Sequence, residues 1–357
     1  MRDEAIRLLR DFSQAHGASG AEGEVRKLFL RELSGSKAEA DGLGGLHFEP
    51  VGASGPRVMV TAHMDEVGFM VQTITAEGFL KFLNLGGWSE NTLLAQRVRV
   101  LTRSGRELPG VITSLPPHFT GGDGKTSPSL DKLYIDLGLE SAEEVRAAGV
   151  ALGDTIVPDG PFAPTAHPER FLAKAFDNRA GCAALALVMK ELRGAKLPCR
   201  AVGVATVQEE VGCRGAVVAA AKAAPDVALV LEGPPADDTP GFSRAEAQGR
   251  LNGGVQIRLY DPSAIMSREL AAFVVSVAEK RGIRHQLTVR RSGGTDAKSI
   301  HLSGTGVPSI VLGVPARYIH THGAMLDVRD FLACVALTRA LLEELTPEVV
   351  AGFTRFV

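Results

Sequence analysis

The sequence predicts an α/β protein with a mostly parallel, mixed central sheet flanked by helices and an inserted, small, β-rich barrel-like domain. From residue 175 onward, segments with helical spacing of apolar residues alternate with short apolar runs, which is typical of βαβ units. The apolar run at 57–62 has the same buried character, whereas about 70–160 consists of short alternating runs between Gly, Pro and Ser. We therefore expect 1–69 and 161–357 to form one discontinuous α/β domain, interrupted by an inserted domain at 70–160.

Each expected element follows from a local pattern of apolar residues. Residues 3–33 predict two amphipathic helices separated at 17–20. Further helices are expected at 178–192, 213–224, 266–282, 296–302 and 327–345, and further strands at 201–207, 227–231, 254–260, 285–291 and 308–313. The inserted domain contains β-type runs at 68–74, 97–101 and 110–113, with one helical stretch around 141–148.

Composition narrows the classes of partner. Net charge is −2 and no long run of Lys or Arg occurs, which argues against a nucleic-acid or membrane-surface partner. Four cysteines without a CxxC pair indicate reduced, mostly buried thiols. The first residues lack the apolar core of a signal peptide, and no apolar stretch has membrane-spanning length, so a soluble cytoplasmic protein is expected.

Two adjacent carboxylates, Glu209 and Glu210, follow the apolar run at 201–207. Neighbouring side chains at a strand end point in different directions, so one glutamate can bind a metal while the other acts as a general base. A charged loop after a buried strand is the alternative explanation for this pair.

Other potential ligands also lie at the ends of expected strands. Because ligand sites in open α/β sheets form beyond the carboxyl ends of the strands, we expect these side chains to converge. Two imidazoles with several carboxylates suit two divalent cations, one carboxylate bridging both. The residues are His63, Asp65, Asp177, Glu209, Glu210, Glu232 and His320.

Each of these residues also has a structural explanation. His63 and Asp65 fit a turn, Asp177 fits a helix N-cap, Glu232 fits a solvated strand end, and His320 fits a surface loop. A carboxylate two residues after His63 would also suit the orientation of a ligating imidazole. Taken together, ligand-type residues at five strand ends favour a site.

Two weaker signals concern substrate binding. Gly294, Thr295 and Asp296 precede an Ala-rich helical turn and can offer backbone amides to a substrate, although a turn with Asp296 as N-cap explains them slightly better. His118 follows two prolines and is a further candidate, with an exposed loop histidine as the default explanation.

Five ordered motifs carry a resemblance to a known family. They are AHMDEVGF at 62–69, FDNRAG at 176–181, QEEVG at 208–212, GTDA at 294–297 and RYIH at 317–320. Together they resemble the tetrahedral aminopeptidase and glutamyl aminopeptidase family of dinuclear metallopeptidases, over nearly the whole chain.

The resemblance implies a specific set of ligands. His63 and Glu232 would hold one metal ion, Glu210 and His320 the other, and Asp177 would bridge both. Two divalent ions per subunit are implied, with Zn or Co preferred and Mn accepted.

The resemblance also implies roles for neighbouring residues. Glu209 would be the general base and acid, and Asp65 would orient His63. The chain departs from the family in having Glu232 where aspartate is more frequent, which bears on metal spacing, and in having His322 where relatives often have Pro.

The implied activity is that of an aminopeptidase, which releases N-terminal residues from peptides with a water activated by two metal ions. The implied assembly is a homododecamer built from dimers, with the β-rich domain at the dimer contacts. An N-acyl amino acid deacylase on the same scaffold and a catalytically silent peptide-binding or assembly protein are the alternatives.

Overall fold

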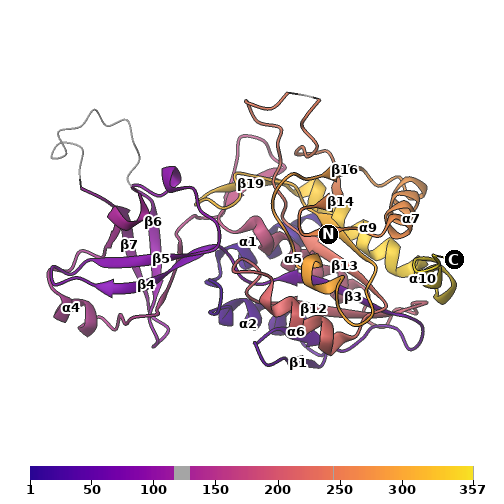
Figure 1. Cartoon of the computed structure of the whole chain (residues 1–357), viewed down its shortest axis with the longest axis horizontal. Coiled ribbons are helices and arrows are strands. Elements are labelled where there is room, and N and C mark those ends of the chain that lie inside the picture. Colours follow the sequence, from indigo (N-terminus) through magenta and orange to yellow (C-terminus); the bar gives the residue numbers. More distant parts are fainter. Residues whose placement is uncertain (116–128, 244, 357) are drawn as a thin grey trace.

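The computed structural model describes residues 1–115, 129–243 and 245–356. Over these residues the chain forms an α/β body and a β-barrel that extends from one side of it (Figure 1). The chain enters the barrel after β3 (Arg57–His63) and leaves it after β9 (Thr155–Pro158). Both marked ends of the chain lie in the α/β body (Figure 1).

The main sheet has nine strands in the described part of the chain. Its order is β1 (Ala38–Ala40), β2 (Leu46–Phe48), β12 (Arg200–Thr206), β3, β13 (Val227–Glu232), β17 (Ser309–Gly313), β14 (Val255–Asp261) and β15 (Ala264–Ile265), with β16 (His285–Val289) paired to β14. The four middle strands β12, β3, β13 and β17 are parallel, whereas β2 and β14 run antiparallel to them. This arrangement confirms the predicted mixed, mostly parallel sheet.

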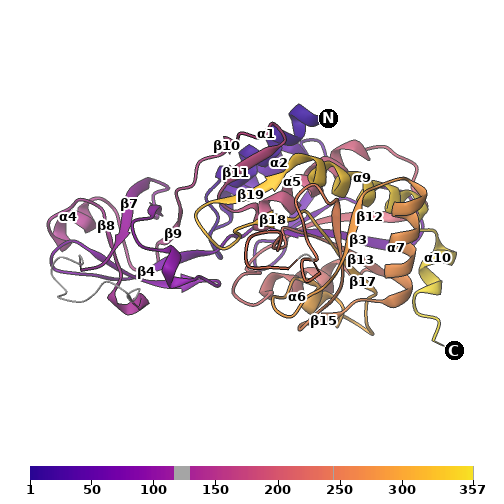
Figure 2. The same cartoon turned by 90° about the horizontal axis from the view of Figure 1, so that it is seen from above.

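Helices cover both faces of this sheet. On one face α1 (Arg2–Gln14), α5 (Phe176–Glu191) and α9 (Val328–Glu344) contact one another, and on the other face α6 (Arg214–Ala223) contacts α8 (Ala297–Ile300). Figure 2 shows α5 and α9 on the opposite side of the strands from α6. The remaining α-helices are α2 (Gly23–Glu32), α4 (Ala142–Ala147), α7 (Arg268–Lys280) and α10 (Pro347–Gly352).

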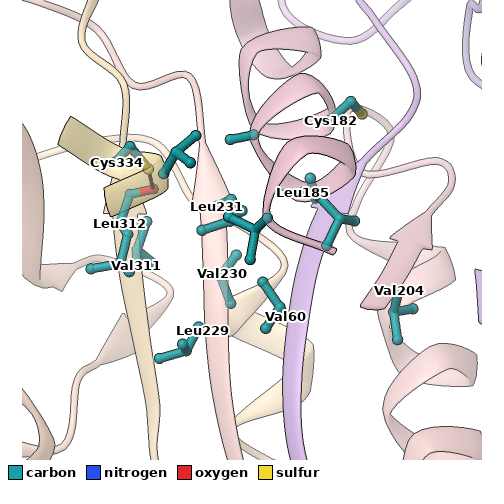
Figure 3. Packing of buried hydrophobic residues seen from close by; sticks show 14 of the residues in the cluster. Val60, Cys182, Leu185, Val204, Leu229, Val230, Leu231, Val311, Leu312 and Cys334 are labelled. Carbon is teal, nitrogen blue, oxygen red and sulfur yellow. Dashed lines mark hydrogen bonds between the residues drawn. The ribbon is translucent and has the colours of Figure 1, made fainter. Parts of the chain in front are cut away.

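The core of the body lies around β13. Every residue of β13 is buried, because the strand has helices on both sides, and this explains its continuous apolar run. In Figure 3, Leu229, Val230 and Leu231 lie between Val60 of β3 and Val311 of β17. The four cysteines are free and buried, as expected for reduced thiols.

The barrel has its own hydrophobic core, separate from that of the body. Its closed strand order is β4 (Gly68–Ile74), β5 (Leu80–Leu85), β8 (Tyr134–Asp136), β7 (Glu107–Thr113), β6 (Arg97–Leu101) and β9. The expected runs at 68–74 and 97–101 coincide with β4 and β6, and the expected run at 110–113 is the second half of β7.

A small sheet next to the main one was missed. It contains β10 (Ala163–Pro164), β11 (Arg170–Ala173), β19 (Ala324–Asp327) and β18 (Ala316–Arg317). These strands are only two to four residues long, too short to show an alternating pattern, so the sequence analysis assigned no strand to any of them. The expected helix at 296–302 was also too long, because α8 spans only Ala297–Ile300. No helix among the described residues combines the length and apolar character needed to cross a bilayer.

Candidate metal centre and active site

The structure brings the five predicted metal ligands together at the carboxyl edge of the parallel strands. His63 and Glu232 end β3 and β13, Asp177 lies at the start of α5, Glu210 follows β12, and His320 lies between β18 and β19. All five line one pocket of about 540 Å³.

Glycines allow the close approach that places Asp177 beside Glu232. A Cβ atom at Gly181 of α5 would lie 2.8 Å from the carbonyl oxygen of Leu231, and one at Gly233 would lie 2.5 Å from the carbonyl oxygen of Phe176. Larger residues at either position would push α5 away from the end of β13. The glycines therefore fix the distance between two of the candidate ligands.

Asp177 occupies the middle of the cluster. Its Oδ1 lies 3.3 Å from His63 Nε2 and its Oδ2 lies 3.4 Å from His320 Nε2. Glu232 Oε2 is 3.6 Å from His63 Nε2, and Glu210 Oε2 is 3.3 Å from His320 Nε2. The ligand atoms thus form two pairs, His63 with Glu232 and His320 with Glu210, on the two oxygens of one carboxylate. The helix-capping alternative does not describe the Asp177 side chain. Asn178, not Asp177, accepts a hydrogen bond from the backbone N–H of Gly181, and the two Asp177 oxygens face the histidines.

Both histidines are held through their other ring nitrogen. His63 Nδ1 lies 3.1 Å from the backbone oxygen of Asp65 and 3.4 Å from its Oδ1. His320 Nδ1 lies 2.8 Å from the backbone oxygen of Gly87, in the loop after β5. An Nδ1–H that donates to these oxygens leaves each Nε2 lone pair directed at Asp177, which is the tautomer a metal ligand needs.

Asp65 also binds backbone groups of the segment that follows β12. Its Oδ1 accepts the backbone N–H of Glu209 at 2.9 Å, and its Oδ2 accepts that of Glu210 at 3.1 Å. Ser19 Oγ donates to the same carboxylate at 2.6 Å. The buried Asp65 therefore fixes the loop that carries both glutamates, a role that the sequence pattern did not indicate.

A buried network of charges supports the cluster from behind, and the sequence analysis missed it. Lys174 Nζ donates to both carboxylate oxygens of Glu66, at 2.6 and 2.8 Å, and Arg179 donates to Glu66 at 3.0 Å. Arg179 also donates to the backbone oxygens of Met64 and Ala15. The network links the end of β3, the start of α5 and the segment after α1. Glu66 and Arg179 lie inside the motifs at 62–69 and 176–181, but nothing in those motifs shows that the two side chains pair.

Electrostatics favour bound cations in this pocket. Burial, together with neighbouring carboxylates, raises the pKa of Glu210 to about 8 and that of Asp296 to about 7, and also raises the pKa of Glu232. Asp177 differs: although burial opposes it, hydrogen bonds from the two histidines lower its pKa. Glu210 Oε1, Glu232 Oε1 and Asp296 Oδ1 are buried without a hydrogen-bond partner among the described residues. Unpaired buried carboxylate oxygens beside two imidazoles fit a site for divalent cations.

Glu209 lies beside the cluster and faces the same pocket. Its Oε2 is 3.9 Å from His63 Nε2, farther than the nearest oxygens of Asp177 and Glu232. Burial, opposed by His63 and reinforced by Glu210, raises the pKa of Glu209 well above its ordinary value. A carboxylate with a raised pKa at the edge of the cluster suits proton transfer.

The candidates for substrate binding have different outcomes. Gly294 and Thr295 line the pocket. Asp296 lies at the N-cap position of α8, as the turn explanation expected, but its side chain makes no capping hydrogen bond. Its carboxylate is buried and accepts a hydrogen bond from Thr206 Oγ1 instead. His118 lies outside the described residues.

Three cationic side chains on the pocket wall were also missed, because no motif marks them. Arg258, Arg290 and Lys298 line the pocket. Arg258 pairs with Asp261 at 3.0 Å, Arg290 pairs with Asp237 at 2.8 Å, and Lys298 is exposed. We refer to these three side chains as the basic wall of the pocket; two of them are already paired with carboxylates, and Lys298 is the exposed one.

His322 is a buried side chain rather than a surface one. It is 9% exposed, neither ring nitrogen has a hydrogen-bond partner among the described residues, and burial lowers its pKa to about 4. Its ring centre lies 5.4 Å from that of Trp88, which in turn stacks on Phe69 of the barrel. His322 thus packs as a neutral ring between the loop of His320 and the barrel.

Comparisons with known proteins found a matching family and several similar structures. The sequence model of the M42 glutamyl aminopeptidase family matches residues 44–337. The chain is 38% identical over 355 residues to a glutamyl aminopeptidase of Lactococcus lactis, covering 98% of each protein. It is similar to the crystal structure of a TET aminopeptidase from a marine sediment Thaumarchaeota archaeon, with TM-score 0.94, 39% identity and 99% of each chain covered. It also resembles a Pyrococcus horikoshii TET1 peptidase described as assembling into a tetrahedron or a large octahedral shell, with TM-score 0.86, 33% identity, and 96% of this chain and 100% of that one covered.

Proposed function

The chain belongs to the M42 glutamyl aminopeptidase family, and on this premise we propose that it is a metal-dependent aminopeptidase that releases N-terminal residues from peptides. The observation that carries the proposal is the placement of Asp177 between the pairs His63–Glu232 and His320–Glu210. A site of this kind suits two divalent cations with one bridging carboxylate.

The ligand types narrow the choice of metal. Imidazole and carboxylate oxygen accept Zn²⁺ or Co²⁺ and tolerate Mn²⁺. His63 and Glu232 would hold one ion, His320 and Glu210 the other, and Asp177 both. When bound, the two ions polarise the scissile carbonyl and lower the pKa of the attacking water.

Glu209 is the residue that we assign to proton transfer. It accepts a proton from the attacking water and returns it to the amine that leaves, which a carboxylate at the pocket wall beside the ligands can do. Asp65 holds the backbone of Glu209 in place through the amide N–H. The carboxylates of the cluster attract the free α-amino group of the substrate, and this attraction selects the first peptide bond.

The basic wall suggests which N-terminal residues are preferred. Lys298, Arg258 and Arg290 line the same pocket as the acidic cluster. The two arginines are paired with carboxylates, so the exposed Lys298 is the positive charge that an acidic side chain of the substrate would meet. We propose a preference for acidic N-terminal residues, in line with the name of the Lactococcus lactis relative.

One panel of substrates tests the activity. Glutamyl-, leucyl- and lysyl-anilides and an N-acetylated glutamyl-anilide are offered to metal-depleted and metal-restored enzyme. We expect metal-dependent cleavage of free-amine substrates, fastest for glutamyl. Cleavage of only the acetylated substrate would instead support a deacylase, and metal binding without any cleavage would support a silent binding protein.

Variants assign the roles within the site. Glu209→Gln is expected to lose roughly 10²- to 10⁴-fold in kcat while retaining two metal ions, because the general base is removed and no ligand is. Glu39→Gln, at a carboxylate whose side chain is 79% exposed, is the matched control and should retain full activity. Lys298→Glu should lower the glutamyl-to-lysyl ratio of kcat/KM, and an unchanged ratio would contradict the assigned basic wall.

We also propose that the protein assembles into a homododecamer built from dimers, as the resemblance implies. The inserted domain at 70–160 would contribute to the dimer contacts. One relative supports the assembly, because the Pyrococcus horikoshii TET1 peptidase is described as assembling into a tetrahedron or a large octahedral shell. Sedimentation velocity at micromolar concentration should give a single species of twelve chains, and a monomer as the major species would contradict this proposal.

A further inference from the structure

A second group of potential ligand atoms lies in the pocket, next to the paired histidines but distinct from them. Glu209, Cys213 and Asp296 each place one ligand-type atom within 4.8 Å of the other two. Cys213 Sγ lies 3.3 Å from Glu209 Oε1 and 3.4 Å from the backbone oxygen of Thr295. Both Glu209 and Cys213 line the pocket, so the group is reached from the space that would admit substrate.

The state of Asp296 independently points to a ligand. Its side chain is fully buried, its Oδ2 is hydrogen-bonded to Thr206, and its Oδ1 has no partner among the described residues. A buried carboxylate oxygen without a partner costs free energy, and a bound cation removes that cost.

We propose that Glu209, Cys213 and Asp296 form a site for a third, thiophilic cation such as Zn²⁺, and that this ion inhibits the enzyme by capturing the carboxylate of Glu209. Zn–S bonds of about 2.3 Å and Zn–O bonds of about 2.0 Å place sulfur and oxygen about 3.5 Å apart in a tetrahedral site. The observed separation of Cys213 Sγ and Glu209 Oε1 is 3.3 Å. The thiol and oxygen are therefore already spaced for one ion.

The chemistry of the thiol makes the site selective. Cys213 would bind as a thiolate, so each ion that binds displaces the thiol proton to solvent. Thiolate ligands favour Zn²⁺ and Cd²⁺, whereas Mn²⁺ prefers oxygen ligands. Excess Zn²⁺ should therefore inhibit through this site and excess Mn²⁺ should not. Inhibition rests on the proposed role of Glu209, but occupancy of the site does not.

Binding is measured first, because it does not depend on activity. Enzyme carrying two Zn²⁺ per chain is titrated with Cd²⁺, with metal content determined after dialysis and the thiolate-to-Cd²⁺ charge-transfer absorption recorded. Wild type should bind a third equivalent together with this absorption. Cys213→Ser, close in size to the native residue, should keep two ions, lose the absorption and bind the third ion roughly tenfold or more weakly. Cys199→Ala is the matched control, because Cys199 is buried outside the pocket, where its Sγ contacts the backbone oxygen of Leu342 in α9. This variant should still bind the third equivalent.

A second variant and an activity assay complete the test. Asp296→Asn should also weaken the third equivalent, which guards against misfolding of Cys213→Ser alone. Excess Zn²⁺ should inhibit wild type and inhibit Cys213→Ser less, each compared with its own rate at two equivalents. The proposed site would be overturned if Cys213→Ser bound a third equivalent of Cd²⁺ with unchanged charge-transfer absorption, or if wild type bound no third equivalent. Absence of peptidase activity with two ions bound would overturn the proposed function while the binding data still decided the site.

Discussion

Removal of one buried charge tests whether the network behind the pocket stabilises the fold. Glu66 is 1% exposed and accepts from Lys174 at 2.6 and 2.8 Å and from Arg179 at 3.0 Å. The side chains of Lys174 and Arg179 are themselves 0% exposed. Glu66→Gln preserves the size of the side chain and one carbonyl oxygen but leaves two buried cations without a counter-charge.

The expected cost follows from this burial. Loss of one partner from a buried ion pair costs about 3–5 kcal/mol, because the remaining charge stays desolvated and unpaired. Burial, opposed by the charge of Glu66, already lowers the pKa of Lys174 to about 8, so in the variant its amine can release its proton and limit the loss. We therefore expect a decrease at the lower end of this range, about 3 kcal/mol, in the free energy of unfolding of the α/β body.

Hydrogen exchange read by mass spectrometry localises the effect. Amides of α5 and β3 should exchange faster in Glu66→Gln, whereas those of β6 in the separate barrel core should not. Glu39→Gln, which loses an exposed pair with Lys222, should change stability by less than about 1 kcal/mol. Adding Lys174→Met to Glu66→Gln should restore part of the loss, because one unpaired cation is removed. A Glu66→Gln protein within 1 kcal/mol of wild type would refute the reasoning.

Three further predictions concern other parts of the molecule. The folded pKa of Lys174, about 8, lies below its value of 10.5 in the unfolded chain, so unfolding takes up a proton between these values. In urea titrations, the free energy of unfolding of wild type should therefore increase relative to that of Lys174→Met as pH rises from 8 to 10, by up to about 1.4 kcal/mol per pH unit. A decrease of this difference between wild type and variant over the same pH range would contradict the prediction. His322→Leu should raise the free energy of unfolding by about 1 kcal/mol in the same titrations, because it replaces a buried ring that has no hydrogen-bond partner in the described part of the chain, and a decrease would indicate an unrecognised partner. Leu83→Asp, 51% exposed on the barrel, should weaken dimers in sedimentation, whereas Ile265→Asp, 75% exposed on the body, should not; the reverse result would move the dimer contact away from the barrel.

Much of the fold was predictable because its regular patterns are local. The apolar runs of β3, β12, β13 and β17 are continuous, since helices cover both faces of these strands, and the alternation with helices is visible along the chain. The short strands β10, β18 and β19 have no such pattern, because each is only two to four residues long. Their sheet also depends on the pairing of β11 with β19, which joins residues as distant in the sequence as Phe171 and Leu326. Their absence from the prediction matters for the site, since His320 lies between β18 and β19.

The candidate ligands were predictable for a similar reason. The carboxyl ends of parallel strands meet at one edge of a sheet, so His63 and Glu232 are brought together by topology alone. The same rule says nothing about Arg258, which lies in the middle of β14, a strand that runs antiparallel to its neighbour β17. Side chains that reach the pocket from such a strand can be found only from its tertiary packing.

Residues that position the candidate ligands were less predictable than the ligands themselves. Asp65 was expected to orient His63, and the structure adds the amides of Glu209 and Glu210 as its partners. Such bonds join a side chain to backbone groups more than a hundred residues away, so residue type and spacing carry no trace of them. The ligand-type residues of this chain are therefore visible in its motifs, whereas the bonds that hold them in place, and the cluster around Cys213, follow only from the folded arrangement.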